Sequence, residues 1–487
     1  MFFRQYYLGC LSHASYMIGD EASGRAVVVD PQRDIAEYLT DAAANELTIV
    51  EVLETHFHAD FVSGHLELAA ATGATIGYGR AAAGLVEFPI ETYGDGDRIA
   101  LGDLVLEIRE TPGHTPESIS IVIRPEGDAA APYGVLTGDT LFIGDVGRPD
   151  LLVATGVTAD DLARSLYHSL HERLLTLPDA TKVFPAHGAG SACGKHLSTE
   201  TVSTIGEQRA TNYALAPMSE DEFAEAVTQG QSAAPLYFSF AAHRNREVHD
   251  LLATESHVGW LSVDEVLTEQ ANGATVLDGR DDRTFASGHL RGSVNVGLAG
   301  RFAEYAGEVI PAGTPIVLVT DAGREAEAQI RLSRIGFDQV LGALLDPPSA
   351  FIAAPHHIEH SSRLSAGALD ARTTAVPGLV IIDVRTASEL ENGAVAGAKH
   401  IPLAALLEGL RDLDPAAPTV VYCASGYRSS IAASLLRAHG FGDVSDLVGG
   451  YAAWAARSSL RRSAASSLVT SEPQACAPEV ATNDDSM

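Results

Sequence analysis

The chain has 487 residues, 46% of them hydrophobic, and this length exceeds what a single hydrophobic core usually supports. Its formal net charge of −32 is spread along the chain, which argues against nucleic acid and anionic membranes as partners. Four cysteines without regular spacing argue against a disulfide framework and for a reducing compartment.

The first group of metal-binding side chains follows an apolar run at residues 49–53, which predicts a buried β-strand. His56, His58 and Asp60 lie close together directly after this run. Neutral imidazoles and a carboxylate are suitable ligands for a divalent transition metal ion. The segment is therefore a candidate metal site.

Three later turns supply matching donors, namely His114, Asp139 and His187. Apolar runs at 135–137 and 182–184 precede the last two, so these donors are also expected at strand ends, where side chains converge. A single histidine among the 18 in the chain would more often be a surface or core residue. Four donor segments in this order favour one shared site.

These segments resemble the metal-binding motifs of the metallo-β-lactamase superfamily, and the resemblance covers roughly residues 1–245. It implies an αββα sandwich fold. Phe61 departs from the two-metal hydrolases of the superfamily, such as glyoxalase II, which carry a histidine ligand of the second ion at this position. Because phenylalanine has no lone pair to donate, we expect one bound ion rather than two.

The segments are also similar to those of persulfide dioxygenases, a type within this superfamily. This resemblance implies that His56, His114 and Asp139 bind one Fe(II) per chain. Two histidines and one carboxylate form the facial triad of non-haem iron oxygenases, which leaves positions open for O₂ and substrate.

The resemblance implies supporting roles for the remaining polar residues. His58, Asp60 and His187 are expected to hydrogen-bond the ligands and orient them, with a weak second metal site as the alternative. Arg148 is expected to hold the carboxylate of a thiol cosubstrate, the alternative being a solvated loop charge. Cys193 lies in a glycine-rich loop and is a candidate to accept a persulfide, although a bystander thiol fits equally well.

The C-terminal half contains an internal duplication. Asp278 and Gly292 in the first copy are as far apart as Asp383 and Gly397 in the second. In both copies short apolar runs, at 317–319 and 420–422, lead into helical stretches at 325–334 and 429–439. Gly336 and Gly440 are expected to end these helices. Strand, helix and strand in succession predict a parallel α/β sheet in each copy.

The second copy carries Cys423 at the start of a loop that resembles the active loop of rhodanese sulfurtransferases. A thiol beneath backbone N–H groups and near a helix N-terminus is stabilised as a thiolate or persulfide, whereas the alternative is a buried, inert cysteine. The resemblance implies that Cys423 and Arg428 are catalytic. The other residues expected to form the loop are Ala424, Ser425, Gly426, Tyr427 and Ser429.

The first copy has no cysteine, and Thr320 falls at the corresponding position. Because it has no thiol, this copy cannot carry sulfane sulfur, and we expect it to act as a spacer or docking surface.

Together, the resemblances imply a bifunctional enzyme of sulfide detoxification. The N-terminal domain would oxidise glutathione persulfide, or another low-molecular-weight persulfide, with O₂ to sulfite and thiol, and the second copy would interconvert persulfide, sulfite and thiosulfate. The alternatives are a glyoxalase II-like zinc hydrolase fused to a sulfurtransferase, and a sulfur-sensing module. The sequence leaves open the thiol carrier, the direction of sulfur transfer and any channelling.

The expected organisation is an α/β multidomain chain. We expect a metallo-β-lactamase-like domain at 1–250, rhodanese-like domains at 258–355 and 362–460, and a flexible tail at 461–487. The beginning of the chain has no long apolar run behind a basic patch, and no later segment is long and apolar enough to span a membrane. We therefore expect a cytoplasmic homo-oligomer, either a dimer or a tetramer.

Overall fold

The computed structural model describes residues 1–125, 131–151, 156–252 and 258–458. The predicted tail at 461–487, including Cys476, lies outside these residues. Among the helices of the described ranges, none is both long and apolar enough to cross a membrane.

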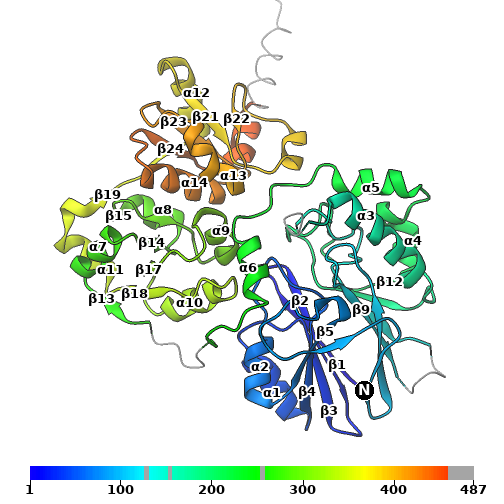
Figure 1. The fold of residues 1–487 in the computed structure, drawn as a ribbon. Helices are drawn as coiled ribbons and strands as arrows, with labels where there is room; N and C mark the ends of the chain where they lie inside the picture. The colour runs from blue at the N-terminus through cyan, green and yellow to red at the C-terminus, as the bar shows by residue number, and fades with distance from the viewer. Residues whose placement is uncertain (126–130, 152–155, 253–257, 459–487) are drawn as a thin grey trace, which may run out of the picture.

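The N-terminal part is built from two six-stranded sheets (Figure 1). The strands of the first sheet, in spatial order, are β1 (Phe2–Leu8), β2 (His13–Asp20), β3 (Arg25–Val29), β4 (Thr48–Leu53), β5 (Thr75–Gly79) and β6 (Glu91–Tyr93). The strands of the second sheet also lie side by side in chain order. They are β7 (Arg98–Leu101), β8 (Leu104–Glu110), β9 (Ile119–Arg124), β10 (Gly134–Gly138), β11 (Lys182–Pro185) and β12 (Ser203–Thr204).

Helices cover the outer face of each sheet. The first sheet is covered by α1 (Ala36–Ala44) and α2 (His65–Thr72). The second is covered by α3 (Ala159–His168), the π-helix η4 (Ser169–Leu174), α4 (Ile205–Thr211) and α5 (Glu220–Thr228). The helix α6 (Phe238–Arg244) then leads towards the C-terminal half.

The side chains of β3 point alternately to its two faces, and this explains why the sheets and helices form layers. Val27 and Val29 pack between the two sheets, whereas Val28 packs against the helices on the opposite face. Successive side chains of a strand point to opposite faces, so a fully apolar strand is stable only when both faces are covered. The αββα sandwich expected from the sequence is therefore confirmed.

Each C-terminal copy contains a five-stranded parallel sheet, as predicted. The first has the strand order β13 (Trp260–Leu261), β18 (Val340–Leu344), β17 (Ile316–Val319), β14 (Thr275–Asp278) and β16 (Val294–Asn295). The second has the order β20 (Ser362–Leu364), β24 (Val444–Leu447), β23 (Thr419–Tyr422), β21 (Val380–Asp383) and β22 (Lys399–His400).

The helices of these two domains follow the same plan. Those of the first are α7 (Val263–Ala271), α8 (Asp282–Ser287), α9 (Phe302–Val309), α10 (Glu325–Ser333) and α11 (Pro347–Ala353). Those of the second are α12 (Ala366–Ala375), α13 (Leu403–Gly409) and α14 (Tyr427–Ala438).

Two glycines end the paired helices as predicted. Gly336 follows α10 and Gly440 follows α14, with φ angles of +77° and +89°. In both turns the next residue, Phe337 or Phe441, donates its N–H to a carbonyl of the helix at 3.1 Å. Glycine favours this left-handed conformation because it has no Cβ.

The domain boundaries stay predictions. The short strand β19 (Ile358–Glu359) lies beyond the expected boundary at residue 355 but still pairs with β15 (His289–Leu290) of the first copy.

The N-terminal domain is tied to the first copy by a buried arginine. Arg33 donates from Nε to Glu67 at 2.9 Å and from Nη1 to Asp338 at 2.7 Å. It also donates to the carbonyls of Ser333 at 3.1 Å and Asp250 at 2.9 Å. One guanidinium thus joins α2, the segment after α6 and the end of α10.

Replacing Arg33 with alanine is expected to destabilise the protein by about 3–5 kcal/mol, because Glu67 would remain as a buried, unpaired carboxylate. Denaturant unfolding would measure this change in the free energy of unfolding. The matched control is Arg291→Ala, which removes an exposed pair with Glu359 and should cost less than about 1 kcal/mol. Equal effects of the two substitutions would contradict the assigned role.

Candidate metal centre and sulfur-transfer loop

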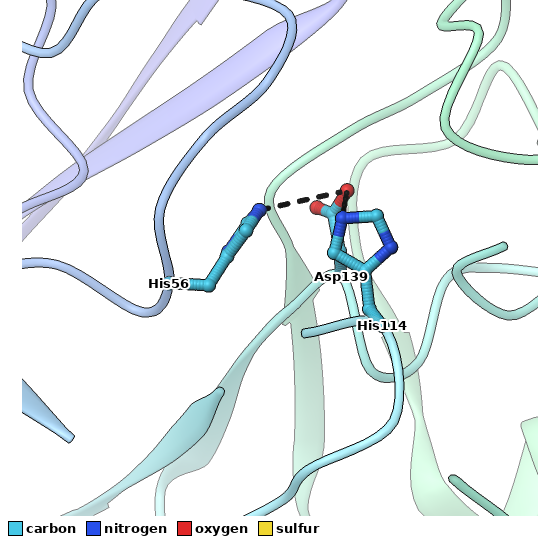
Figure 2. Close-up of side chains that lie close together, drawn as sticks. All are labelled: His56, His114 and Asp139. Carbon is cyan, nitrogen blue, oxygen red and sulfur yellow. Dashed lines mark ion pairs between the residues drawn. The ribbon is translucent and has the colours of Figure 1, made fainter. Parts of the chain in front are cut away.

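His56, His114 and Asp139 come from three turns at the ends of β4, β8 and β10 and meet in one buried pocket (Figure 2). Asp139 Oδ2 lies 3.9 Å from His56 Nε2 and 3.4 Å from His114 Nε2. One donor atom from each residue lies within 4.8 Å of the others. The three residues could therefore hold one ion.

Hydrogen bonds orient both imidazoles towards this point. His56 Nδ1 lies 2.9 Å from Thr55 Oγ1, whose own hydroxyl donates to Asp30. His114 Nδ1 donates to the Arg148 carbonyl at 2.9 Å. Burial lowers the pKa of His56 well below its usual value, and neighbouring histidines lower it further. The Nε2 lone pairs are consequently left available to a metal ion.

The surroundings of Asp139 indicate whether a cation fits this pocket. Its side chain is buried, and neither carboxylate oxygen has a hydrogen-bond partner among the described residues. Burying an unpaired carboxylate is costly unless a cation or a donor compensates for its charge. A divalent ion held by Asp139 and the two imidazoles satisfies that need, so the donor set fits a metal.

His187 and Asp60 form a second group around the same carboxylate. His187 Nε2 lies 3.4 Å from Asp139 Oδ1 and 3.4 Å from Asp60 Oδ2. Its Nδ1 donates to the Ser12 carbonyl at 3.2 Å. Asp139 therefore faces the predicted ligands with one oxygen and His187 with the other.

His58 has different surroundings. Its Nε2 lies 3.1 Å from Asp30 and 3.3 Å from Glu54. Burial lowers the pKa of His58, but the two carboxylates outweigh burial and raise it well above its usual value. Donor atoms of His58, Asp60 and His187 nevertheless lie within 4.8 Å of one another.

Phe61 and His13 fill the wall beside this group. The Phe61 ring is buried, with its centroid 4.3 Å from that of His58 and 4.0 Å from that of His13. Neither nitrogen of His13 has a hydrogen-bond partner in the described structure. Sequence reasoning missed His13 because it lies outside the motifs. His13 forms a backbone β-bridge with His187, and this contact exists only because the fold brings the start of β2 against the turn after β11.

Cys193 and Arg148 also lie in the wall of the pocket. The Cys193 thiol is buried near Asp139 and His187. Burial, together with Asp60 and Asp139, raises the pKa of Cys193 well above its usual value.

Arg148 is buried rather than solvated, and its donors already have partners within the chain. Its guanidinium forms two bonds of 2.7 Å to Asp150 and donates to the carbonyls of Ala192 and Ser232. The predicted role of Arg148 in holding a substrate carboxylate would require some of these bonds to open.

Asn245 fixes the turn that carries the first donors. Its amide nitrogen donates to the carbonyls of His58 and Phe61, both at 2.8 Å, and its amide oxygen accepts from Ser63 N at 2.8 Å. The turn has no hydrogen-bond ladder of its own, so a single side chain satisfies three backbone groups. Sequence reasoning missed this residue because an isolated asparagine carries no motif.

In the second copy Cys423 follows β23 directly and lies beneath the loop that leads into α14. Gly426 N donates to Cys423 Sγ at 3.1 Å, and Ser429 Oγ lies 3.7 Å from the same sulfur. Ala424 and Ser425 complete the loop. The Cys423 carbonyl accepts from Tyr451 N at 2.7 Å, which fixes the cysteine backbone.

The remaining predicted loop residues, Tyr427, Arg428 and Ser429, form the first turn of α14 instead, because Gly426 ends the loop at the start of that helix. This turn is held from two sides. Arg428 forms two bonds of 2.7 Å to Glu389. Burial raises the pKa of Glu389, but Arg428 outweighs it and lowers this pKa to about 2. Tyr427 donates its hydroxyl to the Gly297 carbonyl of the first copy at 2.5 Å.

The first copy has a threonine at the equivalent point. Val319 pairs with Asp278 as Tyr422 pairs with Asp383, so Thr320 and Cys423 are the next residues of matching strands. The Thr320 hydroxyl is buried, and it has no hydrogen-bond partner in the part of the chain that the structure describes.

Comparisons with known families agree with this architecture. The family model of the metallo-beta-lactamase superfamily matches residues 8–187, and that of the rhodanese-like domain matches residues 262–342 and 365–457. The mitochondrial persulfide dioxygenase ETHE1 of Bos taurus is 32% identical over 235 residues, which cover 47% of this chain and 82% of the relative.

Two further relatives differ in coverage. A hydroxyacylglutathione hydrolase of Hahella chejuensis is 40% identical, but over only 26% of this chain and 46% of its own. The crystal structure of a metallo-beta-lactamase from Staphylococcus aureus subsp. aureus COL is 32% identical and covers 70% of this chain and 98% of its own, with a TM-score of 0.64. That likeness extends well beyond the N-terminal domain.

Substituting Asn245 with alanine should leave buried backbone groups near His58 and Phe61 without partners. We expect a loss of about 1–3 kcal/mol in the free energy of unfolding and a roughly tenfold weaker metal affinity. Denaturant unfolding and metal titration would measure the two effects. Asn45→Ala, at an exposed helix end, should change stability by less than about 0.5 kcal/mol. Unchanged metal affinity in Asn245→Ala would contradict the positioning role.

Proposed function

Because the chain belongs to the persulfide dioxygenase family of the metallo-β-lactamase superfamily and carries two rhodanese-like domains, we propose that it oxidises a low-molecular-weight persulfide with O₂ and transfers sulfane sulfur. Persulfide, O₂ and water would give thiol, sulfite and two protons. Cys423 would then interconvert persulfide and sulfite with thiosulfate and thiol. Glutathione persulfide is the substrate that we propose to test first.

The buried group of His56, His114 and Asp139 is the observation that carries this proposal. These residues would hold one Fe(II). When bound, the ion would supply open coordination positions and the electron transfer that O₂ chemistry requires. Phe61 supports a single ion because its ring lies beside His58 and has no lone pair with which to bind a second ion.

The chain's own residues would orient the reactants and exclude water. Thr55 and the Arg148 carbonyl hold the two imidazoles by Nδ1, and His187 adjoins the far oxygen of Asp139. The Cys193 thiol would line the pocket beside Asp139 and His187. Burial of the whole group strengthens each electrostatic interaction within it.

Sulfur transfer would take place at Cys423. Its thiolate would attack the sulfane sulfur of a persulfide or thiosulfate, forming a cysteine persulfide and releasing thiol or sulfite. A nucleophilic acceptor would then take that sulfur and restore the thiolate. Gly426 N–H, which already donates to the sulfur, would stabilise its negative charge in both states.

The dioxygenase proposal is tested by O₂ consumption of anaerobically Fe(II)-loaded protein supplied with glutathione persulfide. We expect O₂ uptake with about one iron per chain and sulfite as product. Asp139→Ala should lose both iron and O₂ uptake, because the remaining imidazoles carry no negative charge to hold the ion. Two zinc ions per chain and cleavage of a thioester without O₂ would identify a glyoxalase II-like hydrolase instead.

The transfer proposal is tested by Cys423→Ser. We expect this variant to retain O₂ uptake with glutathione persulfide and to lose thiosulfate sulfurtransferase activity, because a hydroxyl cannot carry sulfane sulfur. Cys476→Ser, a cysteine beyond the matched rhodanese-like domain, is the control and should keep both activities. Loss of both activities in Cys423→Ser would contradict two independent sites.

A further inference from the structure

The first turn of α14 carries the groups that surround the Cys423 sulfur. Gly426 ends the sulfur-transfer loop, and Tyr427 is the first residue of the helix. Gly426 N donates to Cys423 Sγ at 3.1 Å, and Ser429 Oγ lies 3.7 Å from the same sulfur. Ser429 Oγ also donates to the Gly426 carbonyl at 3.0 Å. A displacement of this turn would therefore move the Gly426 N–H group relative to the sulfur.

Another side of α14 is bonded to the cysteine-less domain. Ser430 Oγ donates to Asn295 Oδ1 at 2.9 Å, and Asn295 N donates to Ser434 Oγ at 2.9 Å. All three residues are buried. Asn295 Nδ2 donates to the carbonyls of Asp278 and Arg280 in its own domain at 3.0 and 2.9 Å. The helix is thus attached to a side chain that is itself fixed.

Tyr427 enters the cysteine-less domain between three residues, Gly297, Gly300 and Tyr305, which we call the Tyr427 socket. The Tyr427 hydroxyl donates to the Gly297 carbonyl at 2.5 Å, and its ring centroid lies 5.5 Å from that of Tyr305. A Cβ atom added to Gly297 would lie 3.3 Å from the Tyr427 ring, and one added to Gly300 would lie 2.7 Å from it. The ring fits only because both positions lack a side chain.

The backbone of the socket is fixed by Arg331 of α10. Its Nη1 donates to the Leu298 carbonyl and its Nη2 to the Gly300 carbonyl, both at 2.5 Å. Arg331 is buried and also bonds Glu327 at 3.3 Å. A side chain added at position 300 would consequently displace the Tyr427 ring rather than the backbone of the socket.

We propose that the cysteine-less domain positions the sulfur-transfer loop through the Tyr427 socket, which holds the Gly426 N–H group at the Cys423 sulfur. This proposal rests on the proposed sulfur transfer at Cys423. A donor that stabilises a reacting charge must be held in place closely, because a small displacement weakens the bond and slows the reaction. Tyr427 and Gly300 are positioning residues, since they act through Gly426.

Hydrogen exchange of the full chain tests the proposal without turnover. Gly300→Ala lies outside the domain of Cys423, its backbone is not left-handed, and the three atoms nearest to the added Cβ all belong to Tyr427. By peptide mass spectrometry, we expect faster exchange in the loop at Ala424 to Gly426 and unchanged exchange in α12. Gly259→Ala, which has open space around the added Cβ, should exchange like the wild type. Unchanged loop exchange in Gly300→Ala would overturn the proposal.

Single-turnover kinetics measure the consequence for sulfur transfer. Thiosulfate gives its sulfane sulfur to the Cys423 thiolate and releases sulfite. In Gly300→Ala the maximal rate of this step should fall roughly tenfold, as for one weakened hydrogen bond to a charged group. The thiosulfate concentration at half-maximal rate should change by less than about twofold. A change in that concentration with an unchanged maximal rate would overturn the positioning role.

Tyr427 variants show whether Gly300 acts through this ring. Tyr427→Phe loses only the bond to Gly297 and should show a smaller effect of the same kind. In a Tyr427→Leu background, which lacks the ring, Gly300→Ala should have no further effect on loop exchange or rate. Additive effects would overturn the socket. A wild type without sulfurtransferase activity would reject the proposed function, whereas faster loop exchange that depends on Tyr427 would still support the socket.

Discussion

A buried carboxylate without hydrogen bonds is the feature on which the N-terminal domain depends. Asp139 adjoins His56 and His114 through one oxygen and His187 through the other, and it receives no hydrogen bond from any of them. Such a group is stable only when positive charge lies beside it. Hydrogen bonds position the donors around this carboxylate. The imidazoles of His56 and His114 are held through Nδ1, and Asn245 fixes the turn that carries His58. A bound metal ion would compensate the buried charge of Asp139.

The cysteine-less copy connects the two candidate sites. At one end, Val62 N donates to the Arg334 carbonyl at 2.7 Å, which ties the turn after His58 to α10. At the other end, Tyr427, the first residue of α14 after the sulfur-transfer loop, donates to the carbonyl of Gly297. This copy has no thiol at the equivalent position, but the strand order of its sheet matches that of the second copy. This copy therefore contacts both the turn that carries His58 and the helix that follows the sulfur-transfer loop.

Much of this could be predicted from local patterns. The strands before the donors, the glycines that end α10 and α14, and the missing thiol at Thr320 all depend on neighbouring residues, so a linear pattern contains them. The assembly of His56, His114 and Asp139 in one pocket was predictable only because their motifs resemble those of a known family. His13, Asn245 and Asn295 carry no such motif, and their contacts join segments that are remote in the chain.

The sequence by itself determined the order and class of the three folded parts, because strand and helix periodicity, glycine turns and the position of a cysteine are local properties. Tertiary structure alone decided which charges are paired. Arg148 is bound to Asp150, His58 is held between two carboxylates, and Arg428 is bound to Glu389. Electrostatic pairing depends on distance and burial in space, and neither can be read from spacing along the chain.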